Sequence, residues 1–255
     1  MSQALTLSRV MLLMTCTVSL AALGAPAALH TLDPQWQQQQ QQNSSAQIMQ
    51  RTQPPQLDLQ GTARRGSVSL EPMYSAQAGS WPFEPFVHNG LFRAIAGYQA
   101  QHPRAVVIRG GSITLEQLRA QLNDSKVLGR HEDGYLLSYP LMIAEDGALL
   151  IEDQVLYLFS PSGTALINQG LLRVNNSRLQ SWSDGRAMAT DRPTRPFIMN
   201  WAGSRLLIDN SELIKIGYNA NLSRGVSSGL SAQQSASLPP AQIQIEDSRF
   251  EEMAS

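Results

Sequence analysis

The chain has 255 residues and a formal net charge of −1 at pH 7, which is long enough for one large domain or two small ones. The near-neutral charge excludes a nucleic-acid-binding protein that works through bulk positive charge. Charged residues make up only 15% of the chain, where about 25% is usual, and polar neutral residues take their place. Of the 19 basic residues only Lys126 and Lys215 are lysines, so arginine, whose planar guanidinium matches carboxylates, is the main cation.

Residues 1–27 have the pattern of an export signal. Arg9 supplies a positive charge, and an apolar stretch over residues 10–23 is too short to span a bilayer comfortably. Small residues follow this stretch, as a signal cleavage site requires. The single cysteine, Cys16, lies inside the signal, so the cleaved chain has neither a disulfide nor a catalytic thiol. We expect a periplasmic protein with no membrane span after signal cleavage.

Residues 28–66 have low complexity. They contain an unbroken glutamine run over residues 37–42 and the pair Pro54-Pro55. Such a segment cannot bury enough apolar surface to offset its ordering entropy. We expect a Gln-rich tether here.

Residues 67–144 are expected to form an N-terminal cap region with one short helix. The β-branched run at residues 105–108 predicts a strand that ends at Gly110-Gly111. Residues 114–122 predict a helix, because Thr114 and Gln117 form a capping box and leucines recur on one face. A series of short strands is expected from Gly134 onward.

A degenerate repeat marks residues 145–255. Each copy has eight positions. The first is aliphatic, the third is Val or Ile, and the fourth is Asn, Asp or Glu. The fifth is Asn or Asp, the sixth is Ser, the eighth is Leu or Phe, and the second and seventh vary. The copies are centred on Val174, Ile208 and Ile245, and a weaker copy lies at Ile151. The centres are 23, 34 and 37 residues apart, and one coil of a right-handed parallel β-helix takes roughly the smallest of these intervals. The longer intervals are expected to carry loops, at residues 183–193 and 219–240.

The alternation within each copy predicts how coils stack. Val174, Ile208 and Ile245 are expected in one inward column. A turn ladder of Asn176, Asn210 and Asp247 should lie beside it, and an outward column should contain Arg178, Glu212 and Arg249. A β-sandwich with Asn-Ser turns is the alternative, although it gives no reason for an eight-residue repeat.

Several local motifs resemble the bacterial periplasmic mannuronan C5-epimerase family of alginate biosynthesis. They lie at residues 108–111, 114–118, 133–137, 194–204, 208–211 and 216–220. The resemblance implies an all-β fold, a right-handed parallel β-helix, and conversion of β-D-mannuronate to α-L-guluronate residues in periplasmic alginate. Family members are about twice this long and carry an Asp-Pro-His-Asp motif, which this sequence lacks. The resemblance therefore implies the N-terminal portion of such an enzyme, with the coils truncated.

No catalytic residue is assigned. Epimerisation at C5 needs a base, a group that stabilises the enolate, and a proton source on the opposite sugar face. All four histidines, His30, His88, His102 and His131, precede the first clear coil. No spacing suggests a metal site, and no cofactor is expected. We therefore expect this chain alone to be inactive as an isomerase.

Substrate binding is assigned to residues that could contact an anionic polysaccharide such as alginate or polymannuronate. Arginines would pair with uronate carboxylates, and aromatic rings would stack on sugar faces. The candidates are Arg173, Arg195, Trp201, Arg205 and Tyr218, with core packing as the alternative for the two aromatic residues. The periplasmic alginate export machinery is a further expected partner. The alternative function is a non-catalytic β-helix, either a polysaccharide-binding scaffold or an adhesin.

Overall fold

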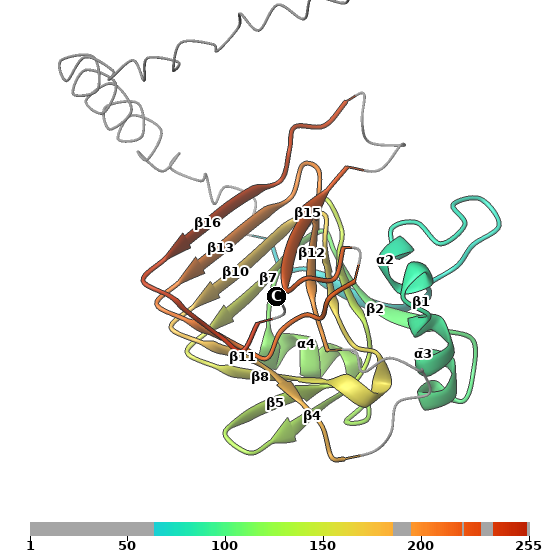
Figure 1. Ribbon diagram of the computed structural model, residues 1–255, viewed down its shortest axis with the longest axis horizontal. Helices are drawn as coiled ribbons and strands as arrows, with labels where there is room; N and C mark the ends of the chain where they lie inside the picture. The colour runs from blue at the N-terminus through green and yellow to red at the C-terminus, as the bar shows by residue number, and fades with distance from the viewer. Residues whose placement is uncertain (1–63, 186–194, 221, 231–236, 254–255) are drawn as a thin grey trace, which may run out of the picture. The chain divides into compact units, whose positions relative to one another are not determined.

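The computed structural model describes residues 64–185, 195–220, 222–230 and 237–253. All of these residues belong to one compact unit, residues 56–255. Within this unit the chain winds through five coils, and each coil contributes one strand to each of three sheets (Figure 1). The predicted export signal and most of the predicted tether lie outside the described residues.

The three sheets are named here in the order in which each coil visits them. Sheet I contains β1 (Ser67–Pro72), β2 (Arg104–Arg109), β6 (Leu141–Ile143), β9 (Leu166–Asn168), β12 (Ile198–Trp201) and β15 (Val226–Gly229). Sheet II contains β3 (Gly111–Thr114), β7 (Gly147–Glu152), β10 (Leu171–Asn175), β13 (Arg205–Asp209) and β16 (Gln242–Glu246). Sheet III contains β4 (Leu128–His131), β5 (Gly134–Leu137), β8 (Val155–Phe159), β11 (Arg178–Trp182), β14 (Glu212–Ile214) and β17 (Arg249–Glu251).

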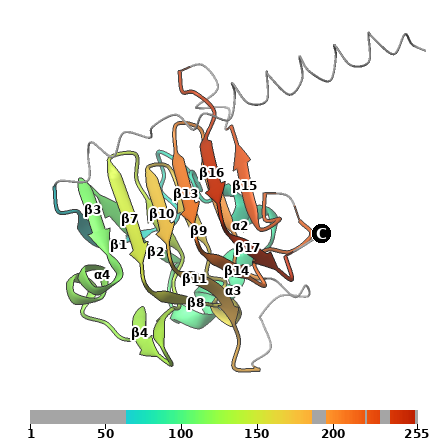
Figure 2. The ribbon, with the colours of Figure 1, turned by 90° about the vertical axis from the view of Figure 1, so that its left-hand side faces the viewer.

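The repeat copies stack in register. In sheet II, Ile151, Val174, Ile208 and Ile245 pair as neighbours on successive parallel strands, which lie side by side in Figure 2. The first three of these side chains are buried in the core between the sheets. The predicted inward column is therefore confirmed. Parallel pairing between coils excludes the β-sandwich, and right-handed connections are the rule for such parallel strands.

The predicted helix is present as α4 (Leu115–Leu122). Its capping box forms as expected, because Thr114 Oγ1 accepts from the N–H of Gln117 and the Gln117 side chain accepts from the N–H of Thr114. Leu115 and Leu118 are buried against the end of the β-helix core. The helix therefore closes the N-terminal end of the core.

Two helices that the sequence analysis did not predict cover the outer face of sheet I. They are α2 (Glu84–His88) and α3 (Leu91–Gln99), which lie beside β1 and β2 in Figure 1. Phe86 and Ile95 form one buried cluster with Val107, Ile167 and Met199, which point outward from β2, β9 and β12 of this sheet. A short 3-10 helix, η1 (Ser160–Ser162), contacts α3. The cap thus has three α-helices instead of one.

Two boundaries differ from expectation. Parallel pairing already begins at β2, which is in register with β6, so the coils start well before residue 145. The segment expected as a loop over residues 219–240 contains β15, whose Val226-Ser227-Ser228-Gly229 sequence has only one apolar residue. Its pairing with β12 overrides this weak local pattern.

The N-terminal edges of the sheets are protected. Antiparallel β1 covers sheet I, and antiparallel β4 covers sheet III. At the edge of sheet II, Arg65 forms a bridge to Ser112. Covering edges in this way prevents pairing with other chains.

Candidate functional site

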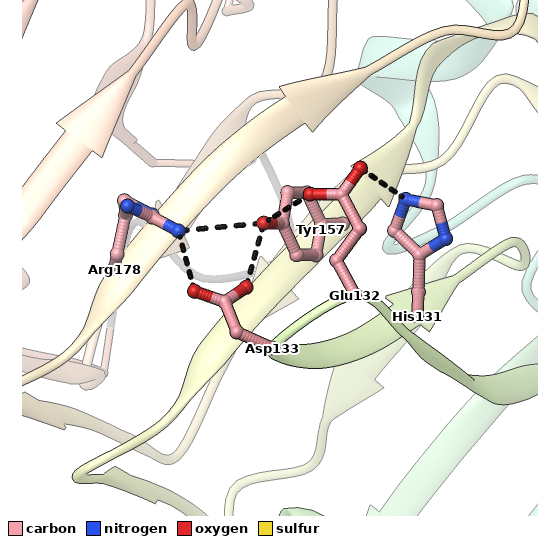
Figure 3. A network of polar contacts seen from close by, with 5 residues as sticks. All are labelled: His131, Glu132, Asp133, Tyr157 and Arg178. Carbon is pink, nitrogen blue, oxygen red and sulfur yellow. Dashed lines mark hydrogen bonds and ion pairs between the residues drawn. The ribbon is translucent and has the colours of Figure 1, made fainter.

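A polar network lies on the outer face of sheet III (Figure 3). Tyr157 Oη is 2.7 Å from Asp133 Oδ1 and 2.9 Å from Glu132 Oε2, and Arg178 Nη2 donates to Asp133 Oδ2 at 3.0 Å. Arg178 Nη2 also lies 3.3 Å from the phenol oxygen, and His131 Nε2 lies 3.6 Å from Glu132 Oε1. We call these five residues the clasp.

The clasp joins three segments that are distant in sequence. Glu132 and Asp133 form the turn between β4 and β5, and Glu132 takes a left-handed conformation there, with φ of 44°. Gly134 follows because a Cβ at this position would lie 2.0 Å from the carbonyl oxygen of Val155. Tyr157 and Arg178 come from outward positions on the neighbouring strands β8 and β11. The turn is thereby held against the next two coils.

Burial and hydrogen bonds to two carboxylates favour the neutral form of the Tyr157 phenol. Burial raises the pKa of Tyr157 to about 12, with further contributions from the hydrogen bonds to Asp133 and Glu132. The hydrogen bond from Tyr157 lowers the pKa of Asp133, and Arg178 adds to this effect. A phenol has a single proton, so Tyr157 donates to one carboxylate at a time.

Within and beside the clasp, His131 packs against two aromatic rings. The ring of His131 meets the rings of Tyr157 and Trp182 edge-on, at centroid distances of 4.9 and 4.5 Å. Tyr157 is only 3% exposed, and its oxygen is already engaged by three polar groups. A sugar ring cannot reach this phenol while the network is intact. The clasp therefore holds the β4–β5 turn against the strands of the next two coils.

Sequence reasoning missed this cluster. It noted only that His131, like the other three histidines, precedes the first clear coil, and it assigned no catalytic residue. The structure brings His131, Tyr157 and Arg178 together because β4 folds back antiparallel onto β5. The outward position of Tyr157 between Leu156 and Leu158 was visible in the sequence, but the hairpin that supplies its partners was not.

The predicted turn ladder lines a groove of about 470 Å³ at the corner between sheets II and III. Asn176 Nδ2 donates to Asp153 Oδ1 at 2.6 Å, and Asn210 Nδ2 donates to Asn176 Oδ1 at 3.0 Å. Asp153, Asn176, Asn210 and Asp247 all have left-handed backbone, which asparagine and aspartate tolerate better than most residues.

The outward column expected beside this ladder is also present. Arg178, Glu212 and Arg249 are register neighbours, and Arg249 Nη1 lies 3.9 Å from Glu212 Oε1. Arg178 instead forms its ion pair with Asp133. The groove thus has charged groups of both signs and amide groups along its walls.

Two of the predicted binding residues lie on neighbouring strands. Arg173 on β10 and Arg205 on β13 are partly exposed, and the register places Arg173 opposite Leu207 and Arg205 opposite Leu171. Both occupy outward positions of sheet II, because the alternate residues of their strands are buried in the core. Arg173 Nη1 forms an exposed ion pair with Glu152 Oε1 at 3.3 Å.

The other three predicted binding residues lie elsewhere. Trp201 is 2% exposed, its ring lies 4.6 Å from that of Trp81, and its Nε1 donates to the carbonyl of Pro82 at 3.0 Å. This corrects its assignment as a sugar-stacking residue, because the ring is packed between sheet I and the cap. Tyr218 is partly buried and packs against Phe197. Arg195 is exposed and donates to the carbonyl of Glu252 at 2.7 Å.

Within the described ranges, no group of three or more His, Cys, Asp or Glu side chains is arranged to hold a metal ion. No helix in the same part of the chain is long and apolar enough to cross a membrane.

The chain is similar in sequence to several mannuronan C5-epimerases. No family model matches the chain. Mannuronan C5-epimerase of Pseudomonas aeruginosa is 31% identical over 135 residues, which are 51% of this chain and 25% of the relative. Mannuronan C5-epimerase of Pseudomonas putida is 30% identical over 172 residues, which are 64% of this chain and 32% of the relative.

A solved structure agrees with the sequence matches. The crystal structure of the periplasmic alginate epimerase AlgG superposes with a TM-score of 0.64 and 22% identity, covering 75% of this chain and 46% of that one. This likeness supports the right-handed parallel β-helix, and the chain spans a quarter to a third of the relatives it matches in sequence. The chain is therefore a homologue of the mannuronan C5-epimerases and matches one part of them.

Proposed function

We propose that this chain acts on alginate as part of a mannuronan C5-epimerase, which converts β-D-mannuronate to α-L-guluronate residues. The observation that carries the proposal is the sequence match to mannuronan C5-epimerases, on a chain with the same fold. The match covers only part of those relatives, so the contribution of these coils is argued from their own residues. We propose that they hold the polymer and do not transfer protons.

The outer face of sheet II is the proposed polymer-binding surface. Sheet I is covered on its outer face by α2 and α3, and sheet III carries the clasp. Sheet II presents Arg173 and Arg205 on neighbouring strands. Guanidinium groups form charge-assisted, often bidentate hydrogen bonds with carboxylates, and an exposed pair such as Arg173–Glu152 is weak enough to exchange for a uronate.

The polar groups of the coils argue against proton transfer by these residues. Abstraction at C5 needs a base and an acid on opposite faces of one sugar ring. In the cluster that combines His131, Tyr157 and Arg178, the phenol and the guanidinium are both hydrogen-bonded to Asp133, and the tyrosine is buried. The sequence also lacks an Asp-Pro-His-Asp motif. We propose that the catalytic groups lie outside the described residues.

The lack of an Asp-Pro-His-Asp motif in the sequence also favours a second candidate function, a non-catalytic β-helix that binds polysaccharide as a scaffold or adhesin. The two candidates share polymer binding and differ in whether any protein that contains these coils epimerises the polymer. For either candidate we propose export to the periplasm, the compartment named for the solved neighbour, and contact with the alginate export machinery.

Polymer binding can be tested with purified chain and polymannuronate in a titration at low salt. The double variant Arg173→Gln/Arg205→Gln should bind about tenfold more weakly, as expected for the loss of one or two charge-assisted hydrogen bonds. The double variant Arg93→Gln/Arg119→Gln, which removes the same two charges from exposed positions on α3 and α4, is the matched control and should bind like the parent. Equal affinity for all three proteins would contradict the assigned face.

Epimerisation is tested by proton NMR of polymannuronate after incubation with the chain. We expect no guluronate signals from the 255-residue chain. Guluronate signals from a longer protein in which epimerase coils follow these would support the epimerase proposal. Their absence from that protein would favour the scaffold, and turnover by the 255-residue chain that Tyr157→Phe abolishes would show that the clasp is catalytic after all.

A further inference from the structure

The outer face of sheet II carries its side chains in three rows, one for each outward position of its strands. Each row crosses the parallel strands that lie side by side in Figure 2, so its members are register neighbours about 4.8 Å apart. Adjacent rows are about 7 Å apart, because successive outward positions of one strand are two residues apart. Arg205 belongs to the first row and Arg173 to the second, so the proposed polymer-binding surface occupies two of the three rows.

The third row is acidic. It contains Glu152, Asn175, Asp209 and Glu246, which lie on β7, β10, β13 and β16. Asp209 and Glu246 are exposed, and the side chain of Glu152 is 40% exposed. We call Glu152, Asp209 and Glu246 the carboxylate row. The outer face of sheet II thus places three carboxylates beside the two guanidinium groups of the proposed surface.

The cations of this face do not neutralise the whole carboxylate row. Arg173 Nη1 lies 3.3 Å from Glu152 Oε1, whereas Glu246 Oε1 accepts from a neutral donor, Gln244 Nε2, at 2.7 Å. Among the described residues, no ion pair involves Asp209 or Glu246. Two uncompensated negative charges therefore border the rows that contain the arginines.

The fold does not need these negative charges. Asp209 and Glu246 are register neighbours, and like charges directly opposite each other on adjacent strands destabilise a sheet. Asn175 occupies the same position on β10, between Glu152 and Asp209, so a neutral side chain also fits there. A like-charge pair that costs stability and that the fold does not require points to a role in binding.

We infer, on the basis of the proposed function, that the carboxylate row is a specificity element of the polymer-binding surface. It confines an anionic polysaccharide to the two rows with arginines and rejects polymers that carry more than one charge per sugar. A polymer with one carboxylate per sugar can place its charges on Arg173 and Arg205. Additional anionic groups would lie about 7 Å from Asp209 or Glu246, a distance at which like charges repel, since the Debye length is about 10 Å at 0.1 M salt. The surface thus combines an attractive and a repulsive element.

The test compares polymannuronate with heparin, a uronate polysaccharide that also carries sulfates. Each polymer is titrated at low salt with the purified full chain, with Asp209→Asn/Glu246→Gln and with Glu116→Gln/Glu251→Gln. The second double variant removes the same two charges from α4 and from sheet III, so it is the matched control for net charge. Both double variants keep the size of the original side chains, and circular dichroism checks that each variant folds like the parent.

Asp209→Asn/Glu246→Gln should bind heparin at least about fivefold more tightly than the parent, because the repulsion of its additional charges is removed. The affinity of this variant for polymannuronate should rise by no more than about twofold, because few of its charges lie against the carboxylate row. The control variant should change both affinities alike, by less than about twofold. Adding Arg173→Gln/Arg205→Gln to Asp209→Asn/Glu246→Gln should remove the gain for heparin, which would place heparin on this face.

Each alternative outcome has a distinct meaning. If the parent binds polymannuronate but the two double variants have the same ratio of heparin to polymannuronate affinity, the specificity role is overturned and the proposed function stands. A gain for heparin that persists without the two arginines would also overturn it. If the parent does not bind polymannuronate while the gain for heparin appears and depends on the arginines, the carboxylate row repels polyanions as inferred and the proposed polymer binding fails. Absence of binding by every protein would overturn both.

Discussion

Tyr157 is held on the outer face of sheet III by groups from three separate segments. Replacing it with Phe keeps the ring packing against His131 but removes the hydrogen bonds to Asp133 and Glu132. We expect Tyr157→Phe to lower the free energy of unfolding by about 1–3 kcal/mol, since hydrogen bonds to charged groups lie in that range. Urea denaturation measures this change. Tyr74→Phe, at a tyrosine that is 65% exposed, is the control and should leave the free energy unchanged.

The same tyrosine predicts a loss of stability at alkaline pH. Its folded-state pKa of about 12 lies above the value of 10.0 for a free phenol. The neutral phenol therefore stabilises the folded chain fully below pH 10, and this contribution is lost as the pH rises from 10 to 12. Urea midpoints should fall more steeply over this range in the parent than in Tyr157→Phe. Parallel curves for the two proteins would contradict the buried, neutral phenol.

Ile208 and Ile245 lie in one inward column, but Ile208 is buried and Ile245 is partly exposed to solvent. An unpaired charge in a buried site costs several kcal/mol, so Ile208→Asp should lower the free energy of unfolding by about 3–5 kcal/mol. Ile245→Asp should cost much less, because that side chain is already 43% exposed. Arg173→Gln, at an outward position, should change stability by less than about 1 kcal/mol. The thermal midpoint should fall most in Ile208→Asp, less in Ile245→Asp and least in Arg173→Gln. Equal midpoints for the three variants would reject the inward assignment.

At the scale of elements, the stacked serines Ser177, Ser211 and Ser248 join each coil to the next at the corner between sheets II and III, because the N–H of one serine donates to the hydroxyl of the following one. Ser211→Ala removes the acceptor for the N–H of Ser177 and the donor to the carbonyl of Asp209. Ser211 is buried, so the loss should cost about 1–3 kcal/mol and speed hydrogen exchange at the amide of Ser177. Ser211→Thr keeps the hydroxyl and should restore the slow exchange. Fast exchange in the threonine variant would indicate that packing, not the hydroxyl, protects this amide.

Some elements could be predicted from local sequence, and others depend on contacts made far along the chain. The capping-box residues Thr114 and Gln117 predict helix α4, and the repeat predicts the strands of sheet II. Helix α3 starts after Gly90, which offers no side-chain cap, although Leu91, Ala94 and Ile95 have helical spacing. Strand β15 has almost no β pattern and exists because β12 pairs with it. Local reasoning also missed the clasp, since its partners meet only after β4 folds back.

At the scale of the whole folded unit, the two ends of the β-helix differ. The first coil is covered by β1, β4 and α4, while the fifth coil has exposed core residues. In solenoid folds each coil is stabilised mainly by its neighbours. Amide exchange should therefore be slowest in β7 and β10 and fastest in β16 and β17. Uniform protection along sheet II would show that the coils unfold as one cooperative unit instead.

The 23-residue interval between Ile151 and Val174 also fixes how the chain can change in length. Deleting residues 152–174 would join Ile151 directly to Asn175, Asn176 and Ser177 and would remove one complete turn of the solenoid. The side-chain alternation, the left-handed corner residue and the hydroxyl that follows it would all keep their phase. Removing one residue from a strand, by contrast, would turn every later side chain of that strand to the opposite face. Gain or loss of whole coils is thus the change in length that preserves the hydrogen-bonding pattern between neighbouring coils.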